Sequence, residues 1–310
     1  MKSDWKRRDF LQLMGVGGVV FGSGLTGCAT RAAGGSPGAA SAGAAAPPAS
    51  PPSDDFFFLQ LTDTHWGYKG PANPHADITL EHAIATINSA DVQPDFIVFT
   101  GDLTHNTDQP TERHDRLSRV RELVSTLKVK DLRFLPGEHD AGADHGDAYR
   151  SVFGETHYSF DHKGVHFVAL DNVSNGDAGI GPEQLQWLST DLAALSPNVP
   201  VIVFAHRPLF DLAPDWDWTT KDGAAAIEVL SRRPNVTVFY GHIHQELHKT
   251  TGAIAHHSSR SLVFPLPAPG SVPKKAPLPW DPSSPDHGLG WRQIARERAA
   301  TRITEIAYRE

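Results

Sequence analysis

Acidic and histidine residues follow five separate apolar runs in this 310-residue sequence. They are Asp63, His65, Asp102, Glu138, His139, Asp140, His206, His242 and His244. Carboxylates and imidazoles without cysteine suit borderline to hard metals such as Zn, Mn, Fe, Ni or Co. A tetrahedral zinc site needs only four ligands, so this set is large enough for two ions with a carboxylate between them.

Two neighbouring metal ions support a definite chemistry. Ions about 3.5–4 Å apart generate a hydroxide near neutral pH and clamp the oxygens of a phosphoryl group. Such a hydroxide removes the need for a Ser, Cys or Lys nucleophile. These residue types therefore predict metal-assisted hydrolysis of phosphate esters.

The apolar runs before these residues have the character of buried strands. Strands are expected at residues 56–61, 96–99, 134–135, 165–170, 201–204 and 236–239. The runs lack strict alternation of apolar and polar residues, which indicates sheets covered on both faces. Helices are expected at residues 77–89, 112–127, 182–195 and 223–230. This order predicts an α/β layered fold, in which ligands bind at the carboxyl edge of the sheets.

The order of the motifs resembles that of the calcineurin-like metallophosphoesterase family. That family has Asp-x-His, Gly-Asp, Gly-Asn-His-Asp/Glu, His and Gly-His-x-His in succession. The matching segments here are Asp63-Thr64-His65, Gly101-Asp102, Gly137-Glu138-His139-Asp140, His206 and Gly241-His242-Ile243-His244. The resemblance implies an α/β fold of the metallophosphoesterase type, a β-sandwich flanked by helices in four layers (αββα). Residues 54–310 would form this domain, with an extended proline-rich excursion at 258–286 and a final strand or two within 290–306.

The resemblance also implies a role for each motif residue. The ligands of the first metal would be Asp63, His65, Asp102 and His244. The ligands of the second would be Asp102, Glu138, His206 and His242, so that Asp102 bridges the two ions and a bridging hydroxide attacks phosphorus. His139 would lie beside the leaving-group oxygen as general acid or charge stabiliser, oriented by Asp140. Weaker candidates for substrate binding are His105, Asn106 and Arg207, the last through its planar guanidinium.

One residue departs from the family pattern. The family has Asn before the motif histidine, and this sequence has Glu138. A carboxylate at this position removes one unit of positive charge from the metal pair. If Glu138 binds, we expect a weaker Lewis acid, a higher pKa for the bridging hydroxide and firmer metal retention. If it points away, the second metal would be weak or absent.

The first 53 residues differ in character from the rest. Arg7-Arg8-Asp9-Phe10-Leu11 resembles the twin-arginine export signal. The apolar run at 10–25 is too short and too rich in Gly for a spanning helix, and it ends in Leu25-Thr26-Gly27-Cys28, which resembles a lipobox. Residues 1–28 are therefore expected to be an export signal, and residues 29–53 a disordered tether of Ala, Gly, Pro and Ser.

The lipobox predicts how the protein meets the membrane. Cys28, the single cysteine, would carry the lipid that anchors the protein, in place of a transmembrane helix. The expected location is the periplasmic side of a bacterial cell envelope. The alternative is an incidental cysteine in a signal that ordinary signal peptidase removes.

Composition excludes several classes of function. A net charge of −8 argues against general nucleic-acid binding, which needs a basic surface. One cysteine excludes an intramolecular disulfide framework. The expected partner is a small phosphate-ester substrate, with two divalent or trivalent ions (Fe, Mn, Zn or Ni) as cofactors; the oligomeric state stays open.

Three interpretations of the function remain. Phosphodiesters are favoured as substrates, because the motif layout resembles the cyclic-nucleotide phosphodiesterase branch more than the purple acid phosphatases, which have a Tyr ligand after Gly-Asp. A phosphomonoesterase of the same family is the first alternative. A non-catalytic envelope lipoprotein on a degenerate phosphoesterase fold is the second, supported mainly by the change of Asn to Glu138.

Overall fold

A computed structural model of the chain describes residues 19–20, 54–297 and 300–308. Apart from Val19–Val20, the expected export signal, Cys28 and the tether lie outside these described residues. No helix in the described ranges combines the length and the apolar character needed to cross a membrane.

The first of two sheets has the strand order β1-β12-β11-β2-β3-β4. Its strands are β1 (Val19–Val20), β2 (Phe56–Leu61), β3 (Phe96–Thr100), β4 (Leu132–Leu135), β11 (Gly290–Glu297) and β12 (Ala300–Ala307). Strands β2, β3 and β4 are parallel, and β11 runs antiparallel to β2. The carboxyl ends of the three parallel strands therefore meet at one edge.

The second sheet has the order β5-β6-β7-β8-β10-β9. Its strands are β5 (Tyr158–His162), β6 (Val165–Ala169), β7 (Val201–Phe204), β8 (Val236–Tyr240), β9 (Leu247–Thr251) and β10 (Ile254–Ser258). Strands β6, β7, β8 and β10 are parallel, so this sheet also gathers its strand ends at one edge.

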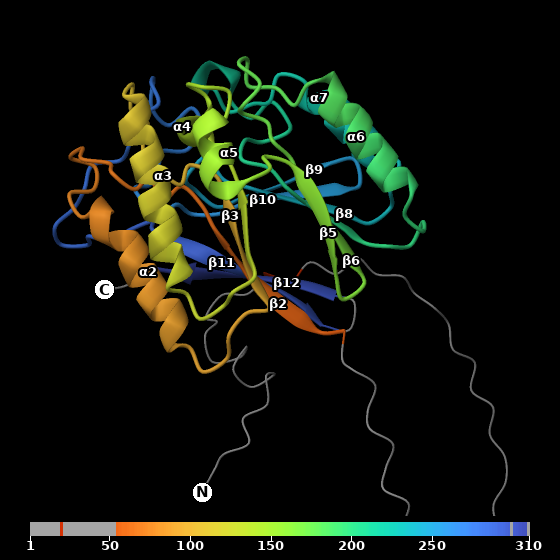
Figure 1. Cartoon of the computed structure of the whole chain (residues 1–310), viewed down its shortest axis with the longest axis horizontal. Helices are drawn as coiled ribbons and strands as arrows, with labels where there is room; N and C mark the ends of the chain where they lie inside the picture. Colours follow the sequence, from red (N-terminus) through yellow and green to blue (C-terminus); the bar gives the residue numbers. More distant parts are fainter. Residues whose placement is uncertain (1–18, 21–53, 298–299, 309–310) are drawn as a thin grey trace, which may run out of the picture.

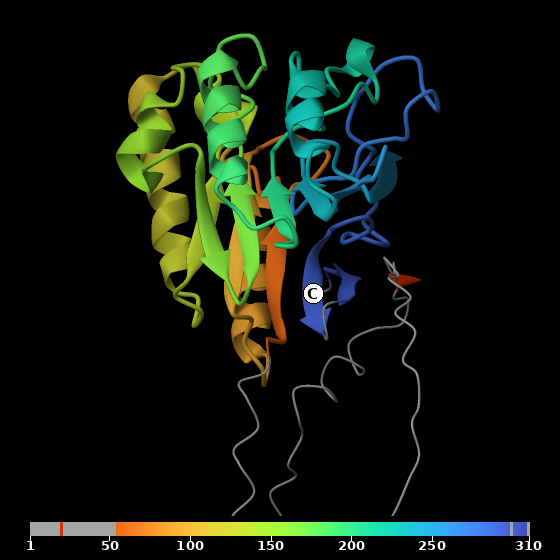
Figure 2. The same ribbon diagram turned by 90° about the vertical axis from the view of Figure 1, so that its right-hand side faces the viewer.

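Helices cover the outer face of each sheet. Helices α2 (Ala76–Ser89), α3 (Pro110–Ser125) and α5 (Asp147–Phe153) pack on the first sheet, and α6 (Pro182–Ala193) and α7 (Gly223–Leu230) pack on the second. Two shorter elements, α4 (Glu138–Ala141) and the 3₁₀ turn η1 (Pro214–Trp216), lie in the segments that follow β4 and β7. Figures 1 and 2 show α2 and α3 on one outer side, and α6 and α7 on the opposite side, with both sheets between them. The predicted four-layer arrangement of helices and sheets is confirmed.

An aromatic core joins the inner faces of the two sheets. Phe58 of β2 stacks on Phe96 of β3 at 4.7 Å between ring centroids, and it meets Phe167, Phe204 and Phe239 of the second sheet edge-on. Burial of each such ring is worth about 1.5–3 kcal/mol. This core keeps the carboxyl ends of the two sheets next to each other.

The expected strands and helices all form, with ends within about two residues of the predicted ones. The sequence patterns did not predict β5, β9, α4 or α5. Between β10 and β11, residues 259–289 contain no helix or strand, as expected for the proline-rich excursion.

Candidate metal centre

The candidate ligands lie in loops that directly follow strands of both sheets. Asp63 and His65 follow β2, Asp102 follows β3, Glu138 follows β4, His206 follows β7, and His242 and His244 follow β8. Five of them have left-handed backbones, with φ of 52° at Asp63, 40° at His65, 49° at Asp102, 65° at His242 and 52° at His244. Non-glycine residues rarely adopt this conformation, and functional sites are where such strain is concentrated.

Two glycines allow the loops to approach one another. Gly101 has a φ of 91°, and a Cβ there would lie 2.4 Å from His206 Nδ1. A Cβ on Gly137 would lie 2.1 Å from Asp102 Oδ1. Gly101 is therefore needed for close contact between loops of the two sheets, and Gly137 for close contact between the segments that follow β3 and β4 of the first sheet.

Asp63, His65 and His244 form the first group of converging donor atoms. His65 Nε2 lies 3.3 Å from His244 Nε2, and Asp63 Oδ1 lies 3.3 Å from the same nitrogen of His244. All three side chains are buried.

Asp102, Glu138, His206 and His242 form the second group. Glu138 Oε1 lies 2.8 Å from His242 Nδ1, and Glu138 Oε2 lies 2.8 Å from His206 Nε2. The carboxylate of Glu138 thus points into this group.

Asp102 connects the two groups. Its Oδ2 atom lies 3.3 Å from His65 Nε2 and 3.4 Å from His206 Nε2. Its Oδ1 atom accepts a hydrogen bond of 2.9 Å from the backbone N–H of His139. One carboxylate oxygen is therefore shared by the two groups, as a bridging ligand requires.

The outer ring nitrogens show that these groups suit metal ions. His206 Nδ1, His244 Nδ1 and His242 Nε2 donate to the carbonyls of Thr100 (2.8 Å), Phe264 (2.7 Å) and Asp217 (3.0 Å). A carbonyl only accepts, so each of these outer nitrogens carries a proton. The other nitrogen of each ring points into the site, where it offers a lone pair to a metal ion once it is deprotonated. The residues present fit two metal ions.

The charges of the site favour cations at the same positions. Burial lowers the pKa of His206, but Asp102 and Glu138 outweigh it and hold that pKa well above its usual value. Burial likewise raises the pKa of Glu138, but His242 and His206 outweigh it and the pKa falls well below its usual value. For His65, burial and then His139 and His244 lower the pKa well below its usual range, so this ring is a neutral ligand.

His139 stands at the rim of the first group. Its ring centroid is 4.5 Å from that of His65, and its Nε2 atom is 4.0 Å from Asp102 Oδ2. Its side chain is about a quarter exposed, as is that of Glu138, whereas Asp63, Asp102 and the histidines of the two groups are buried. Its Nδ1 atom accepts a hydrogen bond from the backbone N–H of Asn106 at 3.1 Å.

Asp140 differs from the expectation that it orients His139. Its carboxylate accepts hydrogen bonds from the N–H groups of Leu103 (2.9 Å), Thr104 (2.9 Å) and Gly137 (3.0 Å). Burial and the charge of Asp102 raise its pKa to about 6. Asp140 therefore ties the β3 and β4 loops together, and Asn106 orients His139 through its backbone.

Arg207 also differs from its expected role as a phosphate ligand. The side chain is buried, and its Nε donates to the carbonyl of Thr219 while its Nη2 contacts Asp217. The guanidinium thus fixes the loop whose Asp217 carbonyl holds His242.

His105 lies against two histidines of the site. Its Nδ1 atom is 3.3 Å from His65 Nδ1, and its ring stacks on His139 at 4.9 Å. Burial, then His139 and Arg116, lower its pKa to about 4, so the ring is neutral and can accept the proton of His65 Nδ1.

The model of the calcineurin-like phosphoesterase family matches residues 58–246, which include every one of these ligands. The chain belongs to this family. Its members depend on a dinuclear metal centre, so the chain is a metal-dependent phosphoric ester hydrolase.

Similar proteins in this family carry several activities in their names. A probable cyclic nucleotide phosphodiesterase from Rhodopseudomonas palustris is 26% identical over 243 residues, covering 70% of this chain and 83% of that protein. The serine/threonine-protein phosphatase CPPED1 from Danio rerio is 29% identical, covering 53% and 59%. A probable glycerophosphodiester phosphodiesterase, GpdQ, from Arcobacter nitrofigilis is 30% identical, covering 48% and 56%. The chain spans little more than half the length of the last two.

Solved structures show the same fold. A dimetal phosphatase from Danio rerio has a TM-score of 0.55 at 16% identity, covering 82% of this chain and 99% of that one. A purple acid phosphatase from yellow lupin has a TM-score of 0.55 at 15% identity, covering 78% and 49%. At such low identity the two matches establish the fold alone. That fold is the predicted metallophosphoesterase-type architecture.

Residues that contribute through their backbone escaped the sequence-based prediction. Thr100, Asp217 and Phe264 orient ligand histidines through carbonyl oxygens. A carbonyl is present at every residue, so no side-chain pattern marks these three. The sequence motifs identify the histidines themselves and not the carbonyls that orient them.

Proposed function

We propose that this chain hydrolyses phosphodiesters with two metal ions, one held by the first donor group and Asp102, the other by the second. The observation that carries the proposal is the position of Asp102 Oδ2, within 3.4 Å of one histidine nitrogen in each group. A shared oxygen between two donor groups suits a dinuclear centre, and such centres transfer phosphoryl groups.

The two ions would supply a water of lowered pKa for attack and positive charge for the phosphoryl oxygens. The chain's own residues supply the rest. Asp63, Asp102 and Glu138 bring negative charge that retains the cations in a buried site. The hydrogen bonds to Thr100, Asp217 and Phe264 hold the imidazoles in the ligand tautomer.

His139 completes the site as a hydrogen-bond donor. Its Nδ1 atom accepts a hydrogen bond from Asn106, so the proton of the neutral ring lies on Nε2. That nitrogen faces Asp102 and the donor groups. His139 can therefore donate a hydrogen bond from Nε2 to the oxygen of the departing alcohol and stabilise the negative charge that develops there.

The preference for diesters is supported by the relatives. Both a probable cyclic nucleotide phosphodiesterase and a probable glycerophosphodiester phosphodiesterase are named for cleavage of diesters. The CPPED1 relative is named a phosphatase, which keeps phosphomonoesters as the second candidate substrates.

Hydrolysis of two chromogenic esters tests the proposal. The purified full-length chain would be assayed with bis-p-nitrophenyl phosphate and p-nitrophenyl phosphate, each with Mn, Zn, Fe and Ni, alongside metal analysis. Two ions per chain and faster turnover of the diester are expected. Turnover of the monoester alone would assign a phosphatase, and one ion or none without turnover would refute the proposal.

We further infer that the protein acts at the periplasmic side of a bacterial envelope, anchored through Cys28. The Arg7-Arg8 motif and the lipobox support this inference. Growth with radiolabelled palmitate should label the wild-type chain and leave the Cys28→Ser variant unlabelled; equal labelling of both would contradict a lipid anchor at Cys28.

A further inference from the structure

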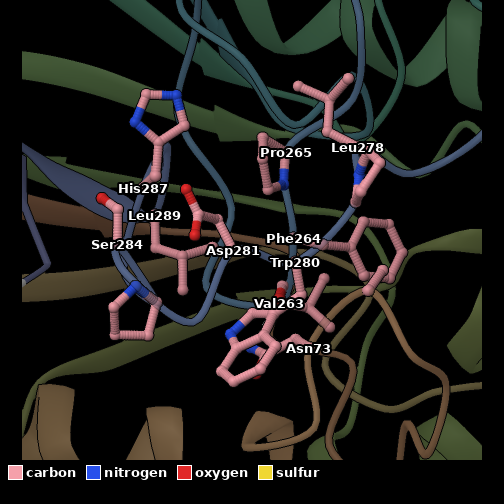
Figure 3. Close-up of a pocket in the computed structure, with 13 residues that line it drawn as sticks. Asn73, Val263, Phe264, Pro265, Leu278, Trp280, Asp281, Ser284, His287 and Leu289 are labelled. Atoms are coloured by element: carbon pink, nitrogen blue, oxygen red, sulfur yellow. Dashed lines mark hydrogen bonds between the residues drawn. The ribbon is translucent and has the colours of Figure 1, made fainter.

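A cavity of about 200 Å³ lies between residues 263–289 and the loop before α2 (Figure 3). Of the thirteen residues that line it, eleven come after residue 246, where the family match ends. The cavity is therefore built mainly by a part of the chain that the family model does not cover. Residues outside the part shared by the family can distinguish the substrates of one member from those of another.

One residue borders both the cavity and the metal centre. The carbonyl of Phe264 accepts the hydrogen bond from His244 Nδ1 at 2.7 Å. Its ring lies 4.9 Å from the ring of His244 and 5.9 Å from that of His65. The same Phe264 lines the cavity. The cavity thus begins one side chain away from the first donor group.

The walls of the cavity are mostly apolar. Figure 3 shows Leu278 and Pro265 together on one side of it, and Asp281 with His287 on another. Val263 and Trp280 add further apolar surface. A volume of about 200 Å³ corresponds to roughly six or seven waters at about 30 Å³ each. An organic ring that displaces these waters would gain from the burial of apolar surface.

The charge of the lining disfavours an anionic guest. Among the thirteen residues described around the cavity there is one carboxylate, Asp281, and neither Lys nor Arg. Hydrogen bonds from the Oγ and N–H of Ser283 to Asp281 lower the pKa of this carboxyl, so it is ionised near neutral pH. The phosphate of a substrate therefore belongs at the metal centre and not in this cavity.

We propose that the cavity binds the uncharged organic group of the phosphate ester, with an aromatic ring as the best fit, while the metal centre binds the phosphate. This inference rests on the proposed function. Phe264 would contact both parts of the substrate. The preferred substrates are then phosphate esters whose alcohol part is aromatic or otherwise largely apolar. Esters whose alcohol part carries a second anionic group are disfavoured.

Three phosphonates with the same anionic head test the preference. Methylphosphonate, benzylphosphonate and 4-carboxybenzylphosphonate would be compared as competitive inhibitors of bis-p-nitrophenyl phosphate hydrolysis by the full-length, metal-loaded chain. A single methylene in an apolar pocket is worth about 10- to 200-fold, so benzylphosphonate should inhibit at least tenfold more tightly than methylphosphonate. The added carboxylate should remove most of that advantage. Equal inhibition constants for the three compounds would overturn the proposal.

Two matched variants locate the effect in the cavity. Leu278→Asp places a negative charge in its wall, and Val272→Asp places the same charge on an exposed side chain of the same segment. The ratio of the methyl to the benzyl inhibition constant should fall at least fivefold in Leu278→Asp and stay at the wild-type value in Val272→Asp. An equal fall in both variants would place the effect outside the cavity and refute the proposal.

A binding measurement separates this inference from the proposed function. The ¹⁹F NMR signal of 4-fluorobenzyl alcohol would be recorded with metal-free, full-length protein. Line broadening that is lost in Leu278→Asp and kept in Val272→Asp supports binding in the cavity, whether or not any ester is hydrolysed. Such broadening together with no hydrolysis would contradict the proposed function and leave the cavity proposal standing. Hydrolysis without any broadening would leave the proposed function intact and overturn the cavity as a binding site.

Discussion

The Nδ1 atom of His139 accepts a hydrogen bond from the backbone N–H of Asn106, at 3.1 Å. A backbone N–H only donates, so this contact fixes the tautomer of the neutral ring with its proton on Nε2. The loop after β3 thereby prepares a residue of helix α4, which follows β4, to donate a hydrogen bond into the site. The neighbouring Asp140 keeps those two segments together.

Replacement of His139 by Gln should slow turnover in a way that depends on the leaving group. Loss of a positioned hydrogen-bond donor to a developing oxyanion costs about 10²–10³-fold in rate when the charge builds up on a poorly stabilised alkoxide, as with a methyl ester. p-Nitrophenolate delocalises its own charge, so its esters should lose much less. The comparison of kcat for bis-p-nitrophenyl phosphate and dimethyl phosphate measures this difference.

The metal content of the His139→Gln variant serves as its control, because His139 is expected to donate a hydrogen bond and not to hold an ion. Unchanged metal content with a selective loss on the poor leaving group supports the role. The same loss on both esters would argue that His139 acts in another way.

Replacement of Glu138 by Asn, the usual family residue, should weaken retention of the second ion. The carboxylate of Glu138 lies 2.8 Å from both His206 Nε2 and His242 Nδ1, and its charge attracts a cation. With one negative charge less, the remaining pair of ions lowers the pKa of the attacking water further, so the acid limb of the pH–rate profile should move to lower pH. Metal analysis after dialysis against a chelator, and the pH–rate profile, measure both effects.

The exposed Glu155 provides a matched control for this experiment. Glu155→Gln removes one exposed carboxylate that belongs to neither donor group and should keep the wild-type metal content. If Glu138→Asn also keeps both the metal content and the pH profile, Glu138 does not act as a ligand.

The sequence predicted those parts of the site that side-chain types encode. Phe96-Ile97-Val98-Phe99 indicates a buried strand, and Gly101-Asp102 after it indicates a ligand at the strand end; the structure has β3 and Asp102 at these places. Parallel strands share one carboxyl edge, so correct strands were enough to bring distant residues together.

Side-chain direction is what the sequence could not predict. Asp140 is adjacent to His139, but it is the third residue of the short helix α4 and its carboxylate turns back to the N–H of Gly137. Arg207 follows His206, yet the loop at 211–220 folds back over Arg207, and the carbonyl of Thr219 accepts a hydrogen bond from its guanidinium. Both outcomes depend on where backbone N–H and carbonyl groups lie, and residue types do not encode those positions.

Two histidines of β10 should make the folded state less stable in acid. Burial and then Lys249 lower the pKa of His256 to about 4, and burial, followed by Arg292 and His248, lowers that of His257 to about 3. Histidine in the unfolded chain has a pKa near 6.5, so the unfolded state binds more protons as the pH falls below that value. The contribution of these two histidines to the free energy of unfolding should therefore be largest above pH 6.5 and fall by about 1.4 kcal/mol per pH unit for each histidine down to about pH 4.

Urea unfolding between pH 7.5 and 4.5 tests this dependence. His257→Gln removes one of the two groups, so its free energy of unfolding should change less steeply with pH than that of the wild type. The exposed His114 on α3 offers a matched control, and His114→Gln should keep the wild-type slope. A His257→Gln slope equal to that of the wild type would show that His257 is not responsible for the acid sensitivity.

Replacement of Arg207 by Ala should weaken the second metal site without a direct effect on substrate binding. The Arg207 guanidinium holds the carbonyls of Thr219 and Asp217, and the Asp217 carbonyl holds His242 Nε2 at 3.0 Å. Loss of an outer partner of a ligand histidine typically costs about 10–100-fold in metal affinity. Titration of the metal-free variant with Mn or Zn, followed by activity, should show a weaker second binding event.

The Michaelis constant at saturating metal distinguishes this role from phosphate binding. If the guanidinium bound the substrate phosphate, its removal would raise KM at every metal concentration. Because the buried Arg207 instead contacts Thr219 and Asp217, saturating metal should return the KM of the variant to within about twofold of the wild type, with the residual loss in kcat. Arg207→Lys keeps the charge but not the planar fork, so it should resemble Arg207→Ala in metal affinity. A KM that stays more than tenfold raised in Arg207→Ala and is restored by Arg207→Lys would assign the charge of Arg207 to the substrate after all.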